Sequence, residues 1–325
     1  MISRLQCFVS GVTALVLVTL ALPGAAQVAA WPDRTVRLVV PWPPGGSTDI
    51  VARLLSAELT RRLRQQVLID NRGGAGSIIG MQHAKDAKPD GYTYLLTSTA
   101  YGFLIDNPKV PVDYVNSFAP AALIGFGDSS LVVHPSLPVR NVAELVALAK
   151  RWPGELRYAS SGVGGFPHLN TELLRLLAGL EFTHVPYKGG GLAINDTIAG
   201  HAQILMNALV SVFPHVQSGR LRLLAVGGAK RNPAVPDVPT IAETVRGYES
   251  TIWWGVFAPR ATPPEFIARL HAEITAVLDS PEFVRRLAEQ GGATAKMSSA
   301  EFGTLMILEQ NKWADVIKRA GIKGE

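Results

Sequence analysis

Cysteine is nearly absent from this chain of 325 residues, and the single Cys7 lies close to the N-terminus. The rest of the chain therefore has no disulfide, no thiol nucleophile and no cysteine metal site. Charged residues are also scarce, at 18%, and no run of five like charges occurs. The charged residues that give the net charge of +5 are scattered along the chain, so they do not indicate a nucleic-acid partner. The hydrophobic fraction of 47% instead predicts a globular chain, and a length of 325 residues suits about two domains.

Long apolar runs are confined to the first thirty residues. No charge occurs between Arg4 and Asp33, and residues 8–22 are almost wholly apolar. A cationic start, a short apolar stretch and small residues beyond it are typical of a secretory signal peptide, here cut after Ala26 or Ala30. An uncleaved anchor is the alternative, but the run is shorter than the roughly 20 residues of a membrane span. We therefore expect residues 1–30 to be a cleaved signal peptide.

Strand and helix patterns alternate along the rest of the chain. Residues 36–40 form a continuous apolar, β-branched run, which predicts a buried strand. From Ser47 the apolar residues recur every four positions, which predicts a helix. The same unit recurs, with further strands expected at 67–69, 92–96, 131–133, 156–159, 182–185, 204–206 and 221–226. This alternation predicts an α/β fold, with parallel sheets that carry helices on both faces.

Two domains are expected from the two series of strands. Leu131 and Val226 are the places where the chain would cross between the sheets. Domain 1 would then comprise residues 31–130 plus 229–325, and domain 2 residues 131–228. Prolines open a helical flank near the C-terminus, with helices expected over 265–278, 281–288 and 298–319.

Three glycine-rich loops each follow an expected strand and open a helix. They are Pro43 to Asp49, Ser160 to Gly165 and Tyr187 to Gly191. Ligands of open α/β sheets bind at the carboxyl ends of strands, and a helix start offers unpaired N–H groups and partial positive charge. Glycine lets the backbone approach a ligand, and the serine and threonine hydroxyls of these loops can donate to a carboxylate. Together the loops predict a site for a small acid.

Each feature also has a purely structural interpretation. A Gly-Gly pair before a helix is often only a tight turn, so the combination of three loops carries the prediction. Asp49 lies in a first helical turn, where a cap is favoured over ligand contact, and its charge argues against a phosphate. Trp42 is equally compatible with a cleft wall and with ordinary packing. Of Trp253 and Trp254, at most one can face a cleft, because adjacent strand residues point to opposite sides.

Enzyme motifs are weak or absent. Gly74-Ala75-Gly76 begins a dinucleotide pattern, but Ile79 stands where the third glycine is needed, and no P-loop occurs. Ser161 and His168 are close in sequence, yet G-x-S-x-G is missing and no carboxylate is spaced to orient the imidazole. The seven histidines are dispersed, with no pair at ligand spacing. We expect no enzymatic activity, no metal and no cofactor.

Several short motifs follow one another from one end of the chain to the other. They are Trp31-Pro32, RLVVPWPPGGSTD (37–49), DNRGGAG (70–76), PDGY (89–92), VPYKG (185–189), VPT (238–240) and FAP (257–259). In this order they resemble the substrate-binding proteins of tripartite tricarboxylate transporters, the Bug family. The resemblance implies a type II periplasmic binding fold, in which two α/β domains close over a small carboxylate in the cleft between them. It also implies a periplasmic protein that delivers its ligand to a membrane permease of a large and a small subunit.

The resemblance places the ligand cleft on the glycine loops and on the end of the third strand. The candidate residues are Trp42, Pro44, Gly45, Gly46, Ser47, Thr48, Asp49, Thr97, Ser98, Ser160, Ser161, Gly164, Gly165, His168, Tyr187, Gly189, Gly190 and Asn207. The family often has acidic residues where Gln203 and Asn207 stand here, so binding of a ligand amine is disfavoured. The family commonly has Phe or a smaller residue at the position of Trp42, which changes the width of the pocket.

We therefore expect a monomeric periplasmic receptor for a small organic carboxylate. Trp42 and Phe166 favour an aromatic or bulky acid over a dicarboxylate such as succinate. The alternative is a sensor subunit that uses the same fold to present its ligand to a membrane signalling kinase. A secreted hydrolase built on Ser161 is a third and disfavoured hypothesis.

Overall fold

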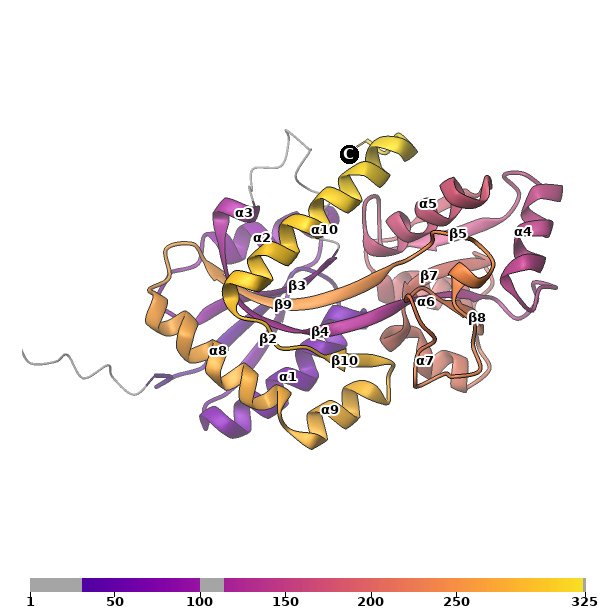
Figure 1. The fold of residues 1–325 in the computed structure, drawn as a ribbon. Coiled ribbons are helices and arrows are strands. Elements are labelled where there is room, and N and C mark those ends of the chain that lie inside the picture. The colour runs from indigo at the N-terminus through magenta and orange to yellow at the C-terminus, as the bar shows by residue number, and fades with distance from the viewer. Residues whose placement is uncertain (1–30, 100–113, 324–325) are drawn as a thin grey trace, which may run out of the picture.

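The computed structural model describes residues 31–99 and 114–323. The expected signal peptide lies outside the described residues. Two lobes lie side by side, each a sheet covered by helices on both faces (Figure 1). The expected α/β fold is confirmed, and the strand β4 (Phe118–Val133) runs through both lobes.

Lobe 1 is built on a mixed sheet with the order β2-β1-β3-β9-β4. Its strands are β1 (Val36–Val40), β2 (Val67–Asn71), β3 (Thr93–Ser98), β9 (Thr251–Pro259) and the first part of β4, with β10 (Gly292–Thr294) on the far side of β4. β1 is parallel to β2 and β3, whereas β9 is antiparallel to both β3 and β4. The sheet is therefore mixed and not purely parallel as the sequence predicted.

Lobe 2 is built on the last residues of β4. Ser129 to Val133 pair with β7 (Ile204–Ala208) and β8 (Arg222–Val226), both antiparallel to β4. β5 (Arg157–Ser160) then lies between β7 and β6 (Thr183–Pro186), parallel to both.

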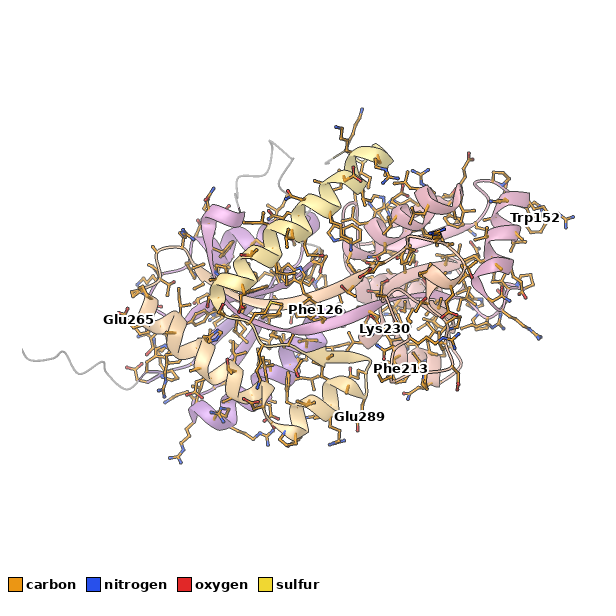
Figure 2. All side chains as sticks on the ribbon, viewed as in Figure 1. Phe126, Trp152, Phe213, Lys230, Glu265 and Glu289 are labelled. Carbon is orange, nitrogen blue, oxygen red and sulfur yellow. The ribbon has the colours of Figure 1, made fainter. Side chains whose placement is uncertain are left out.

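Each sheet is covered on both faces because its strands are apolar on both sides. In lobe 1, Leu38 and Val40 of β1 pack with α1 (Ser47–Leu63) and α8 (Pro264–Leu278), and Val39 packs on the other face. The remaining lobe 1 elements are η1 (Ala75–Ser77), α2 (Ile78–Lys85), α3 (Tyr114–Ser117) and α9 (Pro281–Ala288). In lobe 2 the cover consists of α4 (Val142–Arg151), α5 (Phe166–Ala178), α6 (Gly190–Ile198), α7 (Leu209–Gln217) and η3 (Ile241–Glu243). Side chains fill the space between sheets and helices in both lobes (Figure 2).

The long helix α10 (Ser299–Ala320) joins the two lobes. It starts at a capping box in which Ser298 and Glu301 satisfy each other's backbone N–H groups. Phe302 near its start is buried in a core of lobe 1, and Trp313 further on is buried in a core of lobe 2. The end of the chain therefore packs on both lobes.

Three backbone segments meet between the lobes: β4 at Ser129, the residue after β8 at Gly227 and the residue before β9 at Ser250. Ser129 N–H donates to the Ser250 carbonyl at 3.2 Å, Gly227 N–H to the Ser129 carbonyl at 2.7 Å and Ser250 N–H to the Gly227 carbonyl at 2.8 Å. Between Gly227 and Ser250 the chain stays with lobe 2, because Ile241 and Tyr248 belong to its core. The boundaries at residues 130 and 228 remain a prediction, and this packing favours a return crossing close to Ser250.

Candidate ligand-binding site

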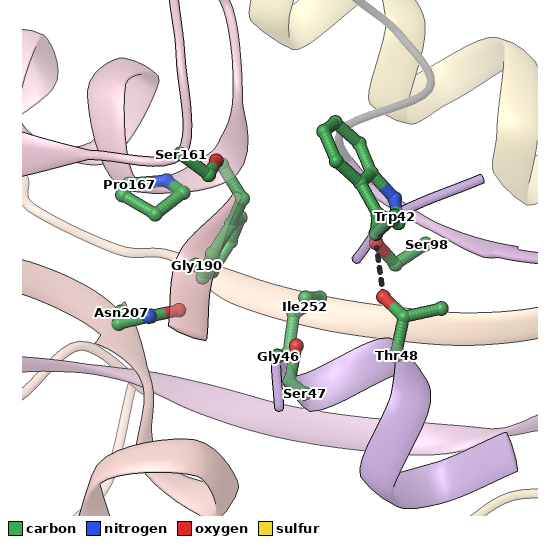
Figure 3. A pocket seen from close by; sticks show the side chains of 11 residues that line it. Trp42, Gly46, Ser47, Thr48, Ser98, Ser161, Pro167, Gly190, Asn207 and Ile252 are labelled. Carbon is green, nitrogen blue, oxygen red and sulfur yellow. Dashed lines mark hydrogen bonds between the residues drawn. The ribbon is translucent and has the colours of Figure 1, made fainter. Parts of the chain in front are cut away.

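A cavity of about 390 Å³, partly open to solvent, lies between the two lobes. We call it the inner cavity. Lobe 1 contributes Trp42, Gly46, Ser47, Thr48, Ser98 and Ile252, and lobe 2 contributes Ser161, Phe166, Pro167, Gly190 and Asn207. Figure 3 shows Asn207, Pro167 and Ser161 on one side of this space and Thr48, Ser98 and Trp42 on the other.

Three helices begin at the inner cavity. The residues before their first turns are Gly46 for α1, Gly165 for α5 and Gly189 for α6, and no side chain caps any of the three. The N–H groups of a first helical turn have no partner inside the helix, and the helix dipole adds partial positive charge there. Both lobes therefore present uncapped, positively polarised helix ends to one space.

Neutral side-chain donors complement these helix ends. The Thr48 hydroxyl donates to Ser98 Oγ at 3.2 Å, which fixes both side chains at the wall. Asn207 is only 4% exposed, and its Oδ1 accepts the Ala208 N–H at 2.8 Å. Its Nδ2 has no hydrogen-bond partner among the described residues. Because a buried donor without a partner is costly, Asn207 Nδ2 is available to a ligand acceptor.

The lining of the inner cavity carries no ionisable side chain. Attraction for an anion would therefore come from backbone dipoles, hydroxyls and one amide. Such donors are fixed in place before a ligand arrives, and they need no counter-ion when the cavity is empty. This arrangement suits a small carboxylate better than a cation.

Asp49 holds the first glycine loop and does not line the inner cavity. Its carboxylate accepts hydrogen bonds from Gly45 N–H at 3.1 Å, Arg53 Nε at 2.9 Å and Asn71 Nδ2 at 3.0 Å. Burial opposes ionisation, but these hydrogen bonds and the Arg53 charge hold the pKa of Asp49 below its ordinary value. The Asp49 carboxylate thus holds the loop in place through these hydrogen bonds.

The second glycine loop rests on a stack of aromatic rings. His168 and His184 stack with ring centroids 4.2 Å apart, and Tyr158 stacks on His184 at 4.7 Å. His168 Nδ1 accepts the Gly164 N–H at 2.9 Å, and His184 Nε2 lies 2.6 Å from Ser160 Oγ. Burial and the neighbouring His184 lower the pKa of His168 to about 3, so this ring is neutral. The stack therefore fixes the shape of the loop.

A second space, which we call the outer chamber, adjoins the inner cavity. Trp42 and Ser161 line both spaces. The outer chamber spans about 1090 Å³ when the solvent at its open side is included. Its other lining residues are Gly74, Gly76, Ser77, Ile79, Gly162, Val163, Pro186, Tyr187 and Lys188.

The structure brings eight of the candidate residues together. Those that line the inner cavity are Trp42, Gly46, Ser47, Thr48, Ser98, Ser161, Gly190 and Asn207. Tyr187 lines the outer chamber instead. The others support the loops or lie behind the lining: Pro44, Gly45, Asp49, Thr97, Ser160, Gly164, Gly165, His168 and Gly189.

Sequence reasoning missed Pro167 and Ile252 as lining residues. Ile252 and Trp254 pack with the same core, whereas Trp253 packs with the core on the other face of β9. The strand alternation that separated the two tryptophans could therefore have placed Ile252 as well. Pro167 has no such signal, because it lines the site only as the second residue of α5.

Other chemistries find little support in the described part of the chain. Within residues 31–99 and 114–323, no group of three His, Asp or Glu side chains is placed to hold a metal ion. Over the same residues, no helix is long and apolar enough to cross a membrane. The Ser160–His184 pair lines neither space, and Ser160 is fully buried. Ser161, on which the hydrolase hypothesis rests, lines both spaces, but among the described residues no hydrogen bond joins it to His168, whose Nδ1 accepts the Gly164 N–H.

Comparison with known proteins identifies relatives along most of the chain. Residues 51–322 match the family described as “Tripartite tricarboxylate transporter family receptor”. The protein BugT of Bordetella pertussis is 34% identical over 92% of this chain and 94% of its own length.

Solved structures share the fold. The R. palustris protein Rpa4515, solved with adipate, is 36% identical and superposes with a TM-score of 0.87 over 90% of this chain and 99% of its own. The periplasmic binding protein BugD is 29% identical, with a TM-score of 0.86 over 91% of this chain and 100% of its own. The family consists of periplasmic solute-binding proteins, not enzymes, and this match confirms the fold that the resemblance implied. The chain thus belongs to the tripartite tricarboxylate transporter receptors of the TctC or Bug type.

Proposed function

We propose that this protein is a periplasmic receptor that binds a small organic carboxylate in the inner cavity and delivers it to a tripartite tricarboxylate-type permease. The observation that carries the proposal is the meeting of three uncapped helix starts and the unpartnered Asn207 amide around a space without ionisable side chains. The adipate-bound relative supports a carboxylate as the ligand class.

The carboxylate would be held from both lobes at once. Ser47 and Thr48 at the start of α1 donate from lobe 1, while Gly190 at the start of α6 and Asn207 donate from lobe 2. A ligand that contacts both lobes binds the closed form more tightly than the open form, so it shifts the population towards closure. Trp42, Phe166 and Ile252 would contact the apolar body of the ligand, which favours a bulky or aromatic acid.

The first experiment is a thermal-shift screen of the mature protein with aromatic acids, adipate, succinate and the amides of the same acids. A ligand bound only by the native state raises the melting temperature by mass action. We expect carboxylates to raise it and their neutral amides to leave it unchanged. Equal stabilisation by acid and amide would contradict recognition of the charge.

The second experiment is the substitution Gly46→Leu, followed by titration calorimetry with the best acid of the screen. A Cβ at Gly46 meets no atom within 4 Å, and the residue has an extended backbone with φ of −85°. The leucine should therefore fold normally and fill the space of the ligand. Gly303→Leu on α10 is the matched control, because it also adds a side chain without a steric clash but lies away from the inner cavity. Unchanged affinity in Gly46→Leu would contradict the proposed site.

Delivery to a permease is tested by uptake. Cells that make the permease subunits should accumulate the labelled acid only when this protein is present in their periplasm, and Gly46→Leu should abolish that uptake. Uptake that does not depend on this protein would contradict a transport role.

A further inference from the structure

We propose that Asn232 is a latch between the two lobes, which stabilises their closed arrangement and so raises the affinity for a ligand that it does not touch. This inference rests on the proposed function, because the latch acts on the closure of the lobes over a carboxylate. It makes Asn232 a positioning residue outside the inner cavity.

Asn232 is fixed to lobe 2. It lies in the segment between β8 and η3, and Val235 and Val238 of this segment pack with a core of lobe 2. The Asn232 side-chain Oδ1 accepts the Ala234 N–H at 2.9 Å, and its main-chain carbonyl accepts the Val235 N–H at 3.0 Å. The residue is only 9% exposed. These contacts within one segment set the direction in which the side-chain amide N–H groups point.

The amide N–H groups of Asn232 point away from lobe 2. Asn232 Nδ2 donates to the Gly291 carbonyl at 3.0 Å, in the turn between α9 and β10 (Figure 1). It also donates to Asp128 Oδ2 at 2.7 Å, on β4 just before this strand enters lobe 2. Because β10 pairs with the lobe 1 part of β4, the bond to Gly291 joins one lobe to the other. The bond to the Asp128 carboxylate is of the stronger, charge-assisted kind.

An apolar contact from lobe 2 lies at the same turn. Leu209, the first residue of α7, is fully buried, and a Cβ built on Gly291 would overlap its Cδ2 atom. Gly291 also has a φ of +81°, a conformation that favours glycine. Glycine thus forms the turn and leaves room for Leu209. The lobes therefore meet at Gly291 through one polar and one apolar contact.

The latch and the contact of the lobes at the inner cavity occur together in this structure. At the cavity, a Cβ built on Gly189 at the start of α6 would lie 3.0 Å from Pro43 Cδ of lobe 1. The inner cavity lies beside β3 and β9, whereas Gly291 lies beside β10, across β4, and neither Asn232 nor Gly291 lines the cavity. A rotation of the lobes about β4 moves Asn232 relative to Gly291, and a hydrogen bond weakens steeply away from its best length and angle. The latch therefore stabilises the closed form over an open one.

The experiment measures the binding of adipate to the mature wild type and to Asn232→Ala by titration calorimetry. If another acid of the screen binds more tightly, that acid takes the place of adipate. The observed affinity falls with the fraction of the protein that adopts the binding-competent form. We expect binding about fivefold weaker in Asn232→Ala, the effect of about one net hydrogen bond. Stopped-flow fluorescence of Trp42 should show this loss as faster dissociation with unchanged association, because the ligand leaves only after the lobes open.

Asn232→Asp is the second variant. It keeps the acceptor for the Ala234 N–H, so the segment should fold, but it places oxygens against the Gly291 carbonyl and the Asp128 carboxylate. This repulsion opposes the closed arrangement, so Asn232→Asp should bind the acid more weakly than Asn232→Ala does.

Arg231→Met is the matched control, since it removes a contact of the neighbouring residue that stays within lobe 2. Arg231 donates to the Glu243 carboxylate at 2.9 and 2.8 Å, and Glu243 belongs to η3. The substitution leaves the contacts at Gly291 in place, so Arg231→Met should bind the acid with the affinity of the wild type.

Three results would overturn the latch and leave the proposed function standing. Asn232→Ala could lower the urea midpoint of unfolding yet bind with wild-type affinity, which would give Asn232 a role in folding alone. Arg231→Met could lose as much affinity as Asn232→Ala, or Asn232→Asp could bind as tightly as the wild type. A wild type that binds no acid of the screen would overturn the proposed function as well.

Discussion

Gly45 and Gly191 face each other across the cleft, with the backbones of the two lobes in close approach. A Cβ built on Gly191 would lie 3.4 Å from the Gly45 carbonyl carbon and 3.0 Å from the Pro44 carbonyl oxygen. The first glycine loop of lobe 1 thus approaches the start of α6 so closely that a Cβ there would fit only after a small shift. The structure therefore has the lobes in contact at this edge of the inner cavity, and the glycines make that contact possible.

Gly191→Ala should weaken ligand binding without unfolding the protein. Gly191 lies in the first turn of α6, where alanine is a better helix former than glycine. In the closed form the added methyl group requires the lobes to separate by a few tenths of an ångström. Overpacking of this kind costs about 1 kcal/mol, so we expect roughly fivefold weaker binding. Calorimetry and a urea titration measure both quantities. Leu192→Ala, beside it on an exposed part of the helix, should bind as the wild type does.

Asn207→Ala should reduce the affinity for a carboxylate by about tenfold, because a hydrogen bond to a charged group contributes about 1.5 kcal/mol or more. Asn207→Asp should reduce it much further, since a carboxylate at this position would repel the ligand. Calorimetry at neutral pH measures both effects. If Asn207→Asp binds the acid as well as Asn207→Ala does, the amide does not face the bound anion.

Stability should fall as the pH drops below the ordinary histidine range. Burial lowers the pKa of His168 to about 3 and also lowers the pKa of His184. Tyr158, Glu172 and Arg175 are the other titratable groups that face this pair. Below about pH 6.5 the unfolded chain binds protons that the folded protein excludes, so the stabilisation present above that pH is progressively lost.

Melting temperatures at about pH 7 and about pH 5 test this linkage, because the two values lie on either side of the ordinary histidine pKa and above those of the carboxylates. His168→Phe keeps an aromatic ring in the stack but cannot titrate, so its melting temperature should change less between the two pH values than that of the wild type. His201→Phe is the control, since that side chain is 70% exposed, and it should keep the wild-type difference. The same pH difference in His168→Phe and the wild type would contradict the role of the stack.

Asp49→Ala should lower both stability and affinity. The substitution leaves the Gly45 N–H, Arg53 and Asn71 without their shared acceptor. Lost hydrogen bonds around a buried carboxylate cost about 1–3 kcal/mol, and the freed loop no longer presents the start of α1 in one conformation. Urea unfolding and calorimetry measure the two losses. Arg53→Ala, which removes only one of these partners, should have the smaller effect on both, and the reverse order would contradict this account.

The local elements of the fold could be predicted from the sequence. The β-branched run of β1 and the four-residue spacing of α1 each act within a few residues, and each element forms where it was expected. The long strand β4 was expected only from residue 131, because proline, glycine and serine interrupt its apolar pattern before that point. Hydrogen bonding to β9 and β7 keeps these residues in the strand despite their low strand propensity. Such pairing depends on the tertiary structure.

The sequence by itself determined that glycine-rich loops precede uncapped helices, since loop and helix are adjacent in the chain and need only local geometry. Only the tertiary structure decided which of these groups face one another. Gly46 and Asn207 meet because two crossing strands join the lobes, and Asp49 and His168 turn away because nearby backbone N–H groups bind them first. Contacts between distant segments depend on how sheets and helices pack, and no short stretch of sequence encodes that packing.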